Sequence, residues 1–261
     1  MTTRPGRVIR FTLVGLRTHL LYMSRSVTTV LFTIATPVLY SLIAIYLSHA
    51  ATHPARVIQA SVAAGLMGIW SSVLFQSGTA FQRQRRLGVL ELIVGAPTPI
   101  LLALFPITLA TAVIGAYAMA TTVFCAVVFF GASITPFLSP LFLAAVLVCI
   151  VTLGFVGVLM ACSFIMLRNA YALVNTLEHP IWMLSGMMVP LSALPGWLHP
   201  LSWLLPSMWG TQAVRDSVVG GPVAVPITIA LGTGATYLAL AVFTVKRVER
   251  RALALATLTL A

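Results

Sequence analysis

The chain has 261 residues, of which 60% are hydrophobic and only 7% are charged, with 15 Lys and Arg against 4 Asp and Glu. A soluble domain carries charge on roughly a quarter of its residues, so this composition excludes a soluble globule and indicates an integral membrane protein. The net charge of +11 does not indicate nucleic-acid binding, because the basic residues flank apolar runs and form no continuous face.

Residues 1–26 form a basic segment that precedes the first long apolar run. At about 100° per residue, its arginines fall on one side of a helix and its leucines on the other; these arginines are Arg7, Arg10, Arg17 and Arg25. Such an amphipathic helix is expected to lie along the cytoplasmic headgroup layer of the membrane. The alternative is a positively charged tail that fixes orientation without a defined helix.

Long stretches without charge predict the membrane-spanning helices. A span needs about 20 apolar residues, and residues 92–167 run for 76 positions without a charged side chain, so that stretch holds two spans. Six spans are predicted in all, at residues 27–47, 57–77, 100–130, 141–167, 170–190 and 223–245. The predicted fold class is therefore all-α integral membrane protein, with a six-span transmembrane domain over residues 27–245 and a tail over residues 246–261.

The basic residues also predict the orientation of these spans. Lys and Arg concentrate in the cytoplasmic loops of membrane proteins. With six spans, 13 of the 15 basic residues fall on one face, and only Arg56 and Arg215 fall on the other. Both termini and the loop over residues 81–99 are therefore predicted to be cytoplasmic.

The loop over residues 81–99 combines a cluster of charges with an amphipathic pattern. It contains Arg83, Arg85 and Arg86, followed by Glu91. Apolar residues recur there at helical spacing and two prolines follow, so a short cytoplasmic helix is predicted. On spacing alone, a loop whose arginines only fix the orientation explains the pattern equally well.

One acidic residue lies inside a predicted span. Glu178 follows Arg168 by ten residues, about 15 Å along a helix, which places it near the middle of the bilayer. A carboxylate at that depth is costly unless it is paired, protonated or exposed to water. With Asn175 and His179 beside it, Glu178 is a candidate for lining a substrate path that favours a cationic or polar cargo. The alternative is a fifth span that begins later and leaves Glu178 at the cytoplasmic interface.

The segment over residues 191–221 combines tryptophans with prolines. Trp197, Trp203 and Trp209 are suited to the headgroup layer. Short re-entrant helices, ended by prolines and closing the outer mouth, are predicted before the last span. A belt of anchoring tryptophans without any closing role is the alternative.

The chain carries no pattern for ATP binding or catalysis. A P-loop needs a lysine in a glycine-rich turn, and the only lysine, Lys246, has no glycine near it. The five histidines have no metal-ligand spacing with cysteines or acidic residues, and His49 and His53, four positions apart, lie in a predicted external loop that Pro54 interrupts. Sequence pairs no serine with a base and a carboxylate. The chain is therefore predicted not to be an enzyme and to hold neither a cofactor nor a metal.

Two stretches resemble the type-2 permeases of bacterial ABC exporters, the membrane subunits that export drugs, antibiotics, lipids or polysaccharides. The sequence RRLGVLELIVGAPTP is similar to the family's cytoplasmic coupling segment; the matching residues are Gly88, Leu90, Glu91, Thr98 and Pro99. Residues 172–216 are similar to the family's fifth span and the proline-rich external segment that follows it.

This resemblance implies partners for the chain. In the family the coupling helix docks in a groove of a separate ATPase, so the expected contact residues are Arg83, Arg85, Arg86, Gly88, Leu90 and Glu91. It also implies two copies of that ATPase, which hold the ATP and Mg²⁺, and a second permease subunit, either identical or a sister chain. The expected location is the bacterial cytoplasmic (inner) membrane.

The chain also departs from the family pattern. Val89 stands where threonine is usual, and Gln82, Gln84 or arginines stand where the family has a glutamate, so an acidic groove is expected on the ATPase. Glu178 and His179 stand where the family has mainly apolar residues.

Two functions follow as hypotheses. The resemblance implies the permease subunit of an ATP-driven exporter that moves an amphiphilic drug, lipid or glycan outward. The residues alone also allow an ion-coupled secondary transporter that uses Glu178, although such a carrier would need ionisable groups in several spans.

Overall fold

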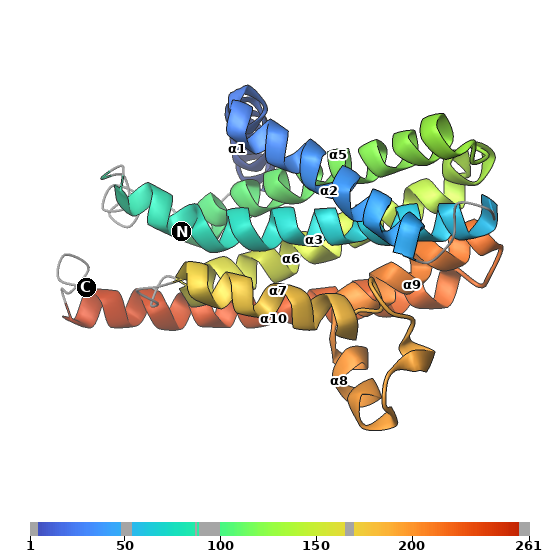
Figure 1. The fold of residues 1–261 in the computed structure, drawn as a ribbon. Helices are drawn as coiled ribbons and strands as arrows, with labels where there is room; N and C mark the ends of the chain where they lie inside the picture. Colours follow the sequence, from blue (N-terminus) through green and yellow to red (C-terminus); the bar gives the residue numbers. More distant parts are fainter. Residues whose placement is uncertain (1–4, 48–53, 87, 89–99, 165–169, 256–261) are drawn as a thin grey trace.

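The computed structural model describes residues 5–47, 54–86, 88, 100–164 and 170–255. Within these residues every regular element is a helix, which confirms the all-α fold class (Figure 1). The elements are α1 (Pro5–Arg25), α2 (Val27–Leu47), α3 (Pro54–Arg86), α5 (Ile100–Phe130), η2 (Thr135–Leu138), α6 (Pro140–Phe164), α7 (Ala170–Leu184), η3 (Leu191–Ala193), η4 (Gly196–Leu198), α8 (His199–Leu204), α9 (Pro206–Val219) and α10 (Ala224–Leu255).

Four of the described helices are long and apolar enough to cross a membrane. These stretches are Pro54–Gln76 in α3, Phe105–Phe130 in α5, Pro140–Ala161 in α6 and Ala224–Arg247 in α10. The first and fifth predicted spans correspond to α2, with a shorter apolar stretch at Thr33–Tyr46, and to α7, which has 15 residues. The total of six spans therefore stays a prediction.

Two helix ends differ from the predicted spans. α7 ends at Leu184, six residues before the predicted end at residue 190, because the chain turns at Gly186, whose φ of 72° lies in the left-handed region. α10 continues to Leu255, ten residues past the predicted end of the last span at residue 245. Much of the predicted C-terminal tail is therefore a helical extension of α10.

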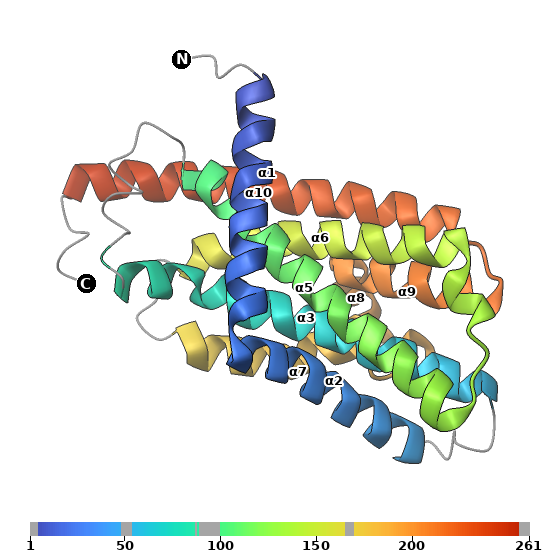
Figure 2. The same ribbon diagram turned by 90° about the horizontal axis from the view of Figure 1, so that it is seen from above.

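α3 lies at the centre of the helix bundle and α10 at its edge (Figures 1 and 2). Buried residues make up 78% of the apolar stretch of α3 but only 22% of that of α10. Glycines allow α3 and α5 to approach closely: a Cβ on Gly68 would lie 2.5 Å from Ala118 Cβ, and one on Gly115 would lie 2.9 Å from Ile69 Cα. Such small-residue contacts are typical of helix pairs in membranes, where backbones approach closely.

α1 runs across the other helices and packs on α5 (Figure 2). Its contact surface is formed by Leu16, Leu20 and Met23, and Gly15 touches α5 where a Cβ would meet Pro106. Arg10, Arg17 and Arg25 are exposed, as the amphipathic pattern predicts. The expected apolar face is only partly covered by protein, because other apolar residues such as Ile9 and Leu13 are also exposed.

The chain between α7 and α9 projects from the side of the bundle (Figure 1). It contains η3, η4 and α8, and α9 then returns along α6 and α10. α8 and α9 each have a proline in their first turn, where proline costs no helical hydrogen bond. These short helices lie where re-entrant helices are predicted; their entry into the bilayer stays a prediction.

Candidate functional site

Glu178 is held between α7 and α3. Its side chain is only 6% exposed, and the Ser71 hydroxyl donates a hydrogen bond of 2.5 Å to its Oε1. A buried acidic group is tolerated when such donors compensate for the lost water. The two residues are 107 positions apart in the chain, so this contact depends entirely on the packing of the two helices.

The partner serine indicates the depth of Glu178 in the bundle. Ser71 lies inside the apolar stretch Pro54–Gln76, 15 residues after Arg56 and 12 before Arg83. These separations correspond to about 22 Å and 18 Å of helix rise. Glu178 therefore lies beside the middle of the charge-free part of α3 rather than near either charged end.

Two aromatic rings from different helices meet near Glu178. The rings of Tyr40 on α2 and Trp182 on α7 meet edge to face, with centroids 5.2 Å apart. Tyr40 interacts electrostatically with Glu178, and Trp182 follows Glu178 by one helical turn. The centroid of the His179 ring lies 4.9 Å from that of the Trp182 ring. We define Tyr40, Ser71, Glu178 and Trp182 as the acid–aromatic cluster.

The acid–aromatic cluster also contains an unused hydrogen-bond donor. Trp182 is 5% exposed, and within the described residues its Nε1 has no hydrogen-bond partner. Leaving such a donor buried and unpaired costs about 1–3 kcal/mol.

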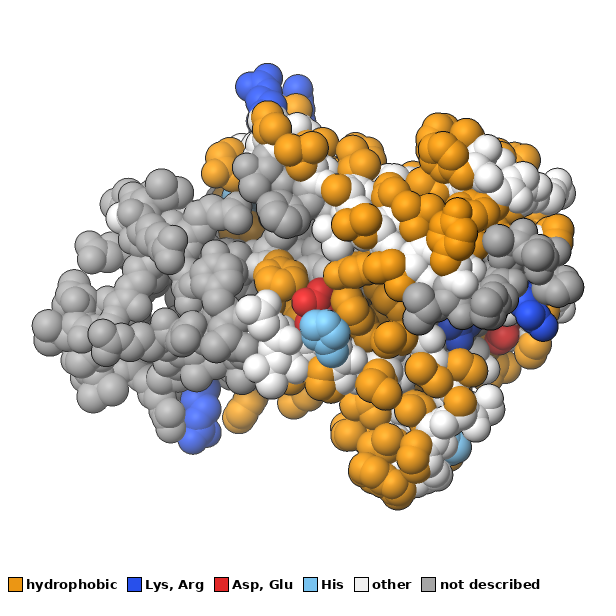
Figure 3. Space-filling view, in the orientation of Figure 1, with side chains coloured by type: hydrophobic (Ala, Val, Ile, Leu, Met, Phe, Trp, Pro, Cys, Tyr) orange, Lys and Arg blue, Asp and Glu red, His pale blue; other side chains and the backbone are white. Residues whose placement is uncertain are grey.

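The three predicted path residues occupy two faces of α7. Asn175 and His179, four positions apart, are both exposed and share one face of the helix, whereas Glu178 points inward to α3. Figure 3 shows an acidic side chain next to a histidine on the face over α7, with apolar side chains to their right. Asn175 and His179 therefore form the exposed polar face of α7, and Glu178 is buried against α3.

Sequence reasoning missed Ser71, Tyr40 and Trp182. A serine or tyrosine within a long apolar run is a weak signal by itself, although polar groups inside spans often mark functional sites. Trp182 gave a clearer signal, because it lies only four residues after Glu178, far from the tryptophans of the predicted outer segment.

The predicted coupling residues lie at the end of α3 and beyond it. Arg83, Arg85 and Arg86 belong to the last turns of α3. Residues 81–86 therefore extend the helix of the second span, whereas a separate short helix was predicted to begin in this loop; the apolar stretch itself ends at Gln76, next to the predicted end at residue 77. Gly88 is exposed and has a φ of 66°, a conformation that ends helices. Leu90 and Glu91 lie outside the described residues.

The outer segment is tied to the bundle by hydrogen bonds from buried or partly buried side chains. Arg215 donates from Nη2 to the Met187 carbonyl oxygen at 3.1 Å, and burial lowers the pKa of its guanidinium. The hydroxyl oxygens of Ser185 and Ser207 lie 2.5 Å apart in a second buried contact.

A second set of hydrogen bonds lies within the outer segment itself. His199 Nε2 lies 3.1 Å from the Leu191 carbonyl oxygen, and the Trp209 indole donates to the Trp203 carbonyl oxygen. Trp197 and Trp203 nevertheless remain mostly exposed, as expected for side chains that meet the headgroup layer.

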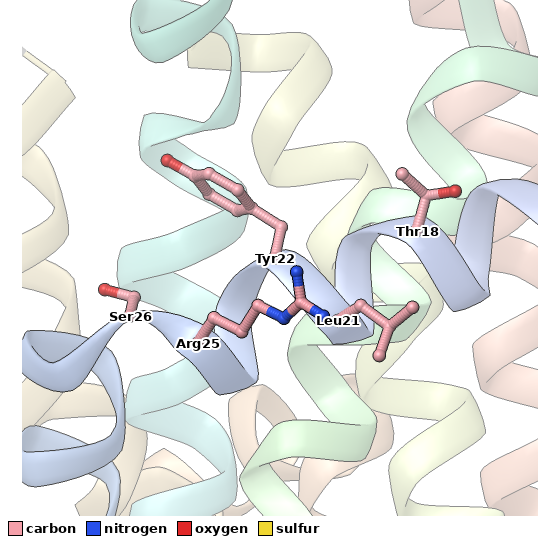
Figure 4. Close-up of a pocket in the computed structure, with 5 residues that line it drawn as sticks. All are labelled: Thr18, Leu21, Tyr22, Arg25 and Ser26. Carbon is pink, nitrogen blue, oxygen red and sulfur yellow. The ribbon is translucent and has the colours of Figure 1, made fainter.

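An open pocket of about 450 Å³ lies where α1 meets α2. Thr18, Leu21, Tyr22, Arg25 and Ser26 line it, and the Arg25 side chain extends back along α1 toward Leu21 and Tyr22 (Figure 4). None of these residues belongs to the predicted coupling segment or to the acid–aromatic cluster.

Comparison with protein families identifies the chain. The family model described as ABC-2 type transporter matches residues 10–219, which are 210 of the 261 residues. The chain belongs to the ABC-2 type transporter family. The matched range includes the acid–aromatic cluster, the arginines at the end of α3 and the outer segment up to the end of α9. A comparison with curated proteins found no match.

As an ABC-2 protein, the chain is the membrane permease subunit of an ABC transporter. Permeases of this family usually work with an ABC ATPase and are generally not enzymes themselves. The apolar helices agree with this assignment and show a multi-pass membrane protein.

Proposed function

We propose that this permease forms the transmembrane part of an ATP-driven exporter, with a second permease subunit and two copies of a separate ATPase. The exporter moves an amphiphilic drug, lipid or glycan outward across the bacterial cytoplasmic membrane. ATP and Mg²⁺ are bound by the ATPase. Membership of the ABC-2 family carries this proposal and favours it over an ion-coupled carrier.

The length of α3 supports an attachment point for the ATPase. α3 has 33 residues, about 50 Å of helix rise, whereas the hydrocarbon core of a bilayer is about 30 Å thick. The apolar stretch ends at Gln76, ten residues before Arg86, so α3 extends about 15 Å further. The three arginines at this end are therefore presented outside the apolar layer, where an ATPase with an acidic groove can bind them.

The direction of the helices supports cytoplasmic termini. The last residues of α3 and of α10 lie at the same end of the bundle in both views (Figures 1 and 2). Each of these helices ends in basic residues, Arg83, Arg85 and Arg86 on α3 and Lys246, Arg247 and Arg250 on α10. Basic residues concentrate on the cytoplasmic side, so both helix ends are assigned to that side.

Asn175, Glu178 and His179 are proposed to line the cargo path. The two exposed residues give α7 a polar face in the same part of the bundle as Glu178. A chain with so few spans encloses no wide path, so a second permease subunit is proposed to face this surface. ATP binding would then shift the population between inward-open and outward-open arrangements of the two permeases.

The experiment is affinity co-purification of the tagged permease with an ABC ATPase encoded in the same genome, followed by measurement of MgATP hydrolysis. Replacing Arg83, Arg85 and Arg86 together by alanine is expected to lower ATPase recovery at least about tenfold, since several charge-assisted contacts are lost. The matched control replaces Lys246, Arg247 and Arg250 by alanine and should retain the ATPase. Equal recovery with both triple variants would refute docking at the end of α3.

A further inference from the structure

The acid–aromatic cluster places an acidic group and two aromatic rings together inside an apolar bundle. Glu178 supplies an acidic group at mid-depth, with one hydrogen bond from Ser71. Tyr40 and Trp182 supply aromatic rings in contact with each other. The cluster thus combines a negative group with π-electron surfaces, and both attract a positive charge.

We propose that the acid–aromatic cluster is a binding site for a lipophilic organic cation, such as a quaternary phosphonium or ammonium compound. This inference rests on the proposed function, because it specifies the cargo of the same path. A carboxylate and aromatic rings both attract a positive charge, and the ring contribution is about 0.5–2 kcal/mol, larger when water is excluded. An anionic cargo would instead be repelled by Glu178.

The surroundings select an organic cation over a metal ion. Ca²⁺ requires six to eight oxygen ligands, whereas the acid–aromatic cluster offers one carboxyl group and two hydroxyl groups. Within the described residues, no three His, Cys, Asp or Glu side chains are grouped so that they could hold a metal. Buried apolar residues of the same helices, such as Leu74 on α3 and Val174 on α7, suit a cation whose charge is spread over hydrocarbon groups.

The exposed face of α7 provides the approach to the acid–aromatic cluster. Asn175 and His179 are exposed on this face of α7, and Glu178, which is 6% exposed, lies one turn from Asn175 on the same helix. His179 is exposed and its ring lies against Trp182. A cation that reaches Glu178 from this face therefore passes the exposed side chains of Asn175 and His179.

The test uses the full permease in lipid nanodiscs and two probes of the same shape and opposite charge, tetraphenylphosphonium and tetraphenylborate. The wild-type protein should bind tetraphenylphosphonium saturably, and Glu178→Gln should raise its Kd at least about tenfold, as expected when one partner of a close charge pair is lost. Tetraphenylborate binding should not weaken in that variant. Asp216→Asn is the matched control, because it neutralises an acid on α9 and should leave both affinities unchanged.

A second measurement on the wild-type protein covers the case in which Glu178→Gln does not fold. A lipid-soluble carbodiimide modifies carboxyl groups in apolar surroundings, and mass spectrometry locates the modified peptide. Saturating tetraphenylphosphonium should slow modification of Glu178 severalfold, whereas tetraphenylborate should not. The proposed site is refuted if Glu178→Gln and the wild type bind the phosphonium equally. It is also refuted if Glu178 is modified equally fast with and without the cation.

These outcomes separate the site from the proposed function. The binding assay contains no ATPase, so a cation that binds through Glu178 supports the site even if no ATPase co-purifies. Conversely, the permease could co-purify with its ATPase through the α3 arginines and still show no Glu178-dependent binding. In that case the proposed function stands and the cation site is refuted.

Discussion

The close contact of α3 with α2 and α5 predicts a steric penalty at Gly68. A Cβ added there would lie 2.5 Å from Ala118 Cβ and 2.8 Å from Pro37 Cγ, whereas carbon atoms in contact are about 3.5–4.0 Å apart. The methyl group therefore overlaps with two neighbouring helices by about 1 Å. Overpacking of this kind costs about 1–3 kcal/mol, against a gain of about 1 kcal/mol when alanine replaces glycine in a helix.

Two other helical glycines provide controls for this prediction. Gly232 on α10 has no atom within 4 Å of an added Cβ, and at Gly154 on α6 the nearest atom is 3.7 Å away, an ordinary contact. Alanine at either position should stabilise the helix through its higher helix propensity, and its methyl group should not overlap with neighbouring atoms. Gly68→Ala should therefore be less stable than these two variants by about 1–3 kcal/mol.

The assay is the free energy of unfolding in mixed detergent and SDS micelles, followed by tryptophan fluorescence for all three glycine variants and the wild type. Each variant is first checked for a monodisperse gel-filtration peak. If Gly68→Ala proves as stable as Gly232→Ala, the three helices do not approach as closely as described, and the reasoning fails.

Three further predictions concern other contacts. A double-mutant cycle of Ser71→Ala and Glu178→Gln should give a coupling free energy of about 0.6–1.7 kcal/mol, as for hydrogen bonds between membrane helices; additive effects on unfolding would contradict the hydrogen bond. Arg215→Met removes the donor to the Met187 carbonyl and should cost about 1–3 kcal/mol, together with faster proteolysis of the outer segment; unchanged cleavage rates would speak against that anchor. Cys149 is fully buried and should react with a maleimide only after SDS denaturation, so labelling in the folded protein would show a different packing.

Apolar runs predicted helix positions well where a charge or a turn residue bounds the run. α5 begins and ends where the third span was predicted, at residues 100 and 130, because the run itself stops there. The end of α7 was not predicted, since the sequence remains apolar through Met187 and Met188 while the backbone turns at Gly186. Hydrophobicity sets which residues avoid water and carries little information about the backbone angle of one glycine.

The candidate site was predicted in part. Glu178 was recognisable because a single charge in a long apolar run needs a structural explanation. Its contacts with Ser71 and Tyr40 were not predictable, because they depend on how three helices from distant parts of the chain pack together. The end of the second span was predicted to within one residue, but the extension of α3 beyond it was not, since Arg83 begins the polar loop in sequence but continues a helix in three dimensions.

The glycine contacts between α3 and α5 have a mechanical consequence for energy transfer. These two helices make the most extensive contact of any described pair, and they are the helices that enter and leave the segment proposed to touch the ATPase. A force on that segment would therefore move both helices as one unit. Because the Ser71 hydroxyl on α3 donates a hydrogen bond to Glu178 on α7, such a movement would either carry α7 along or break this hydrogen bond.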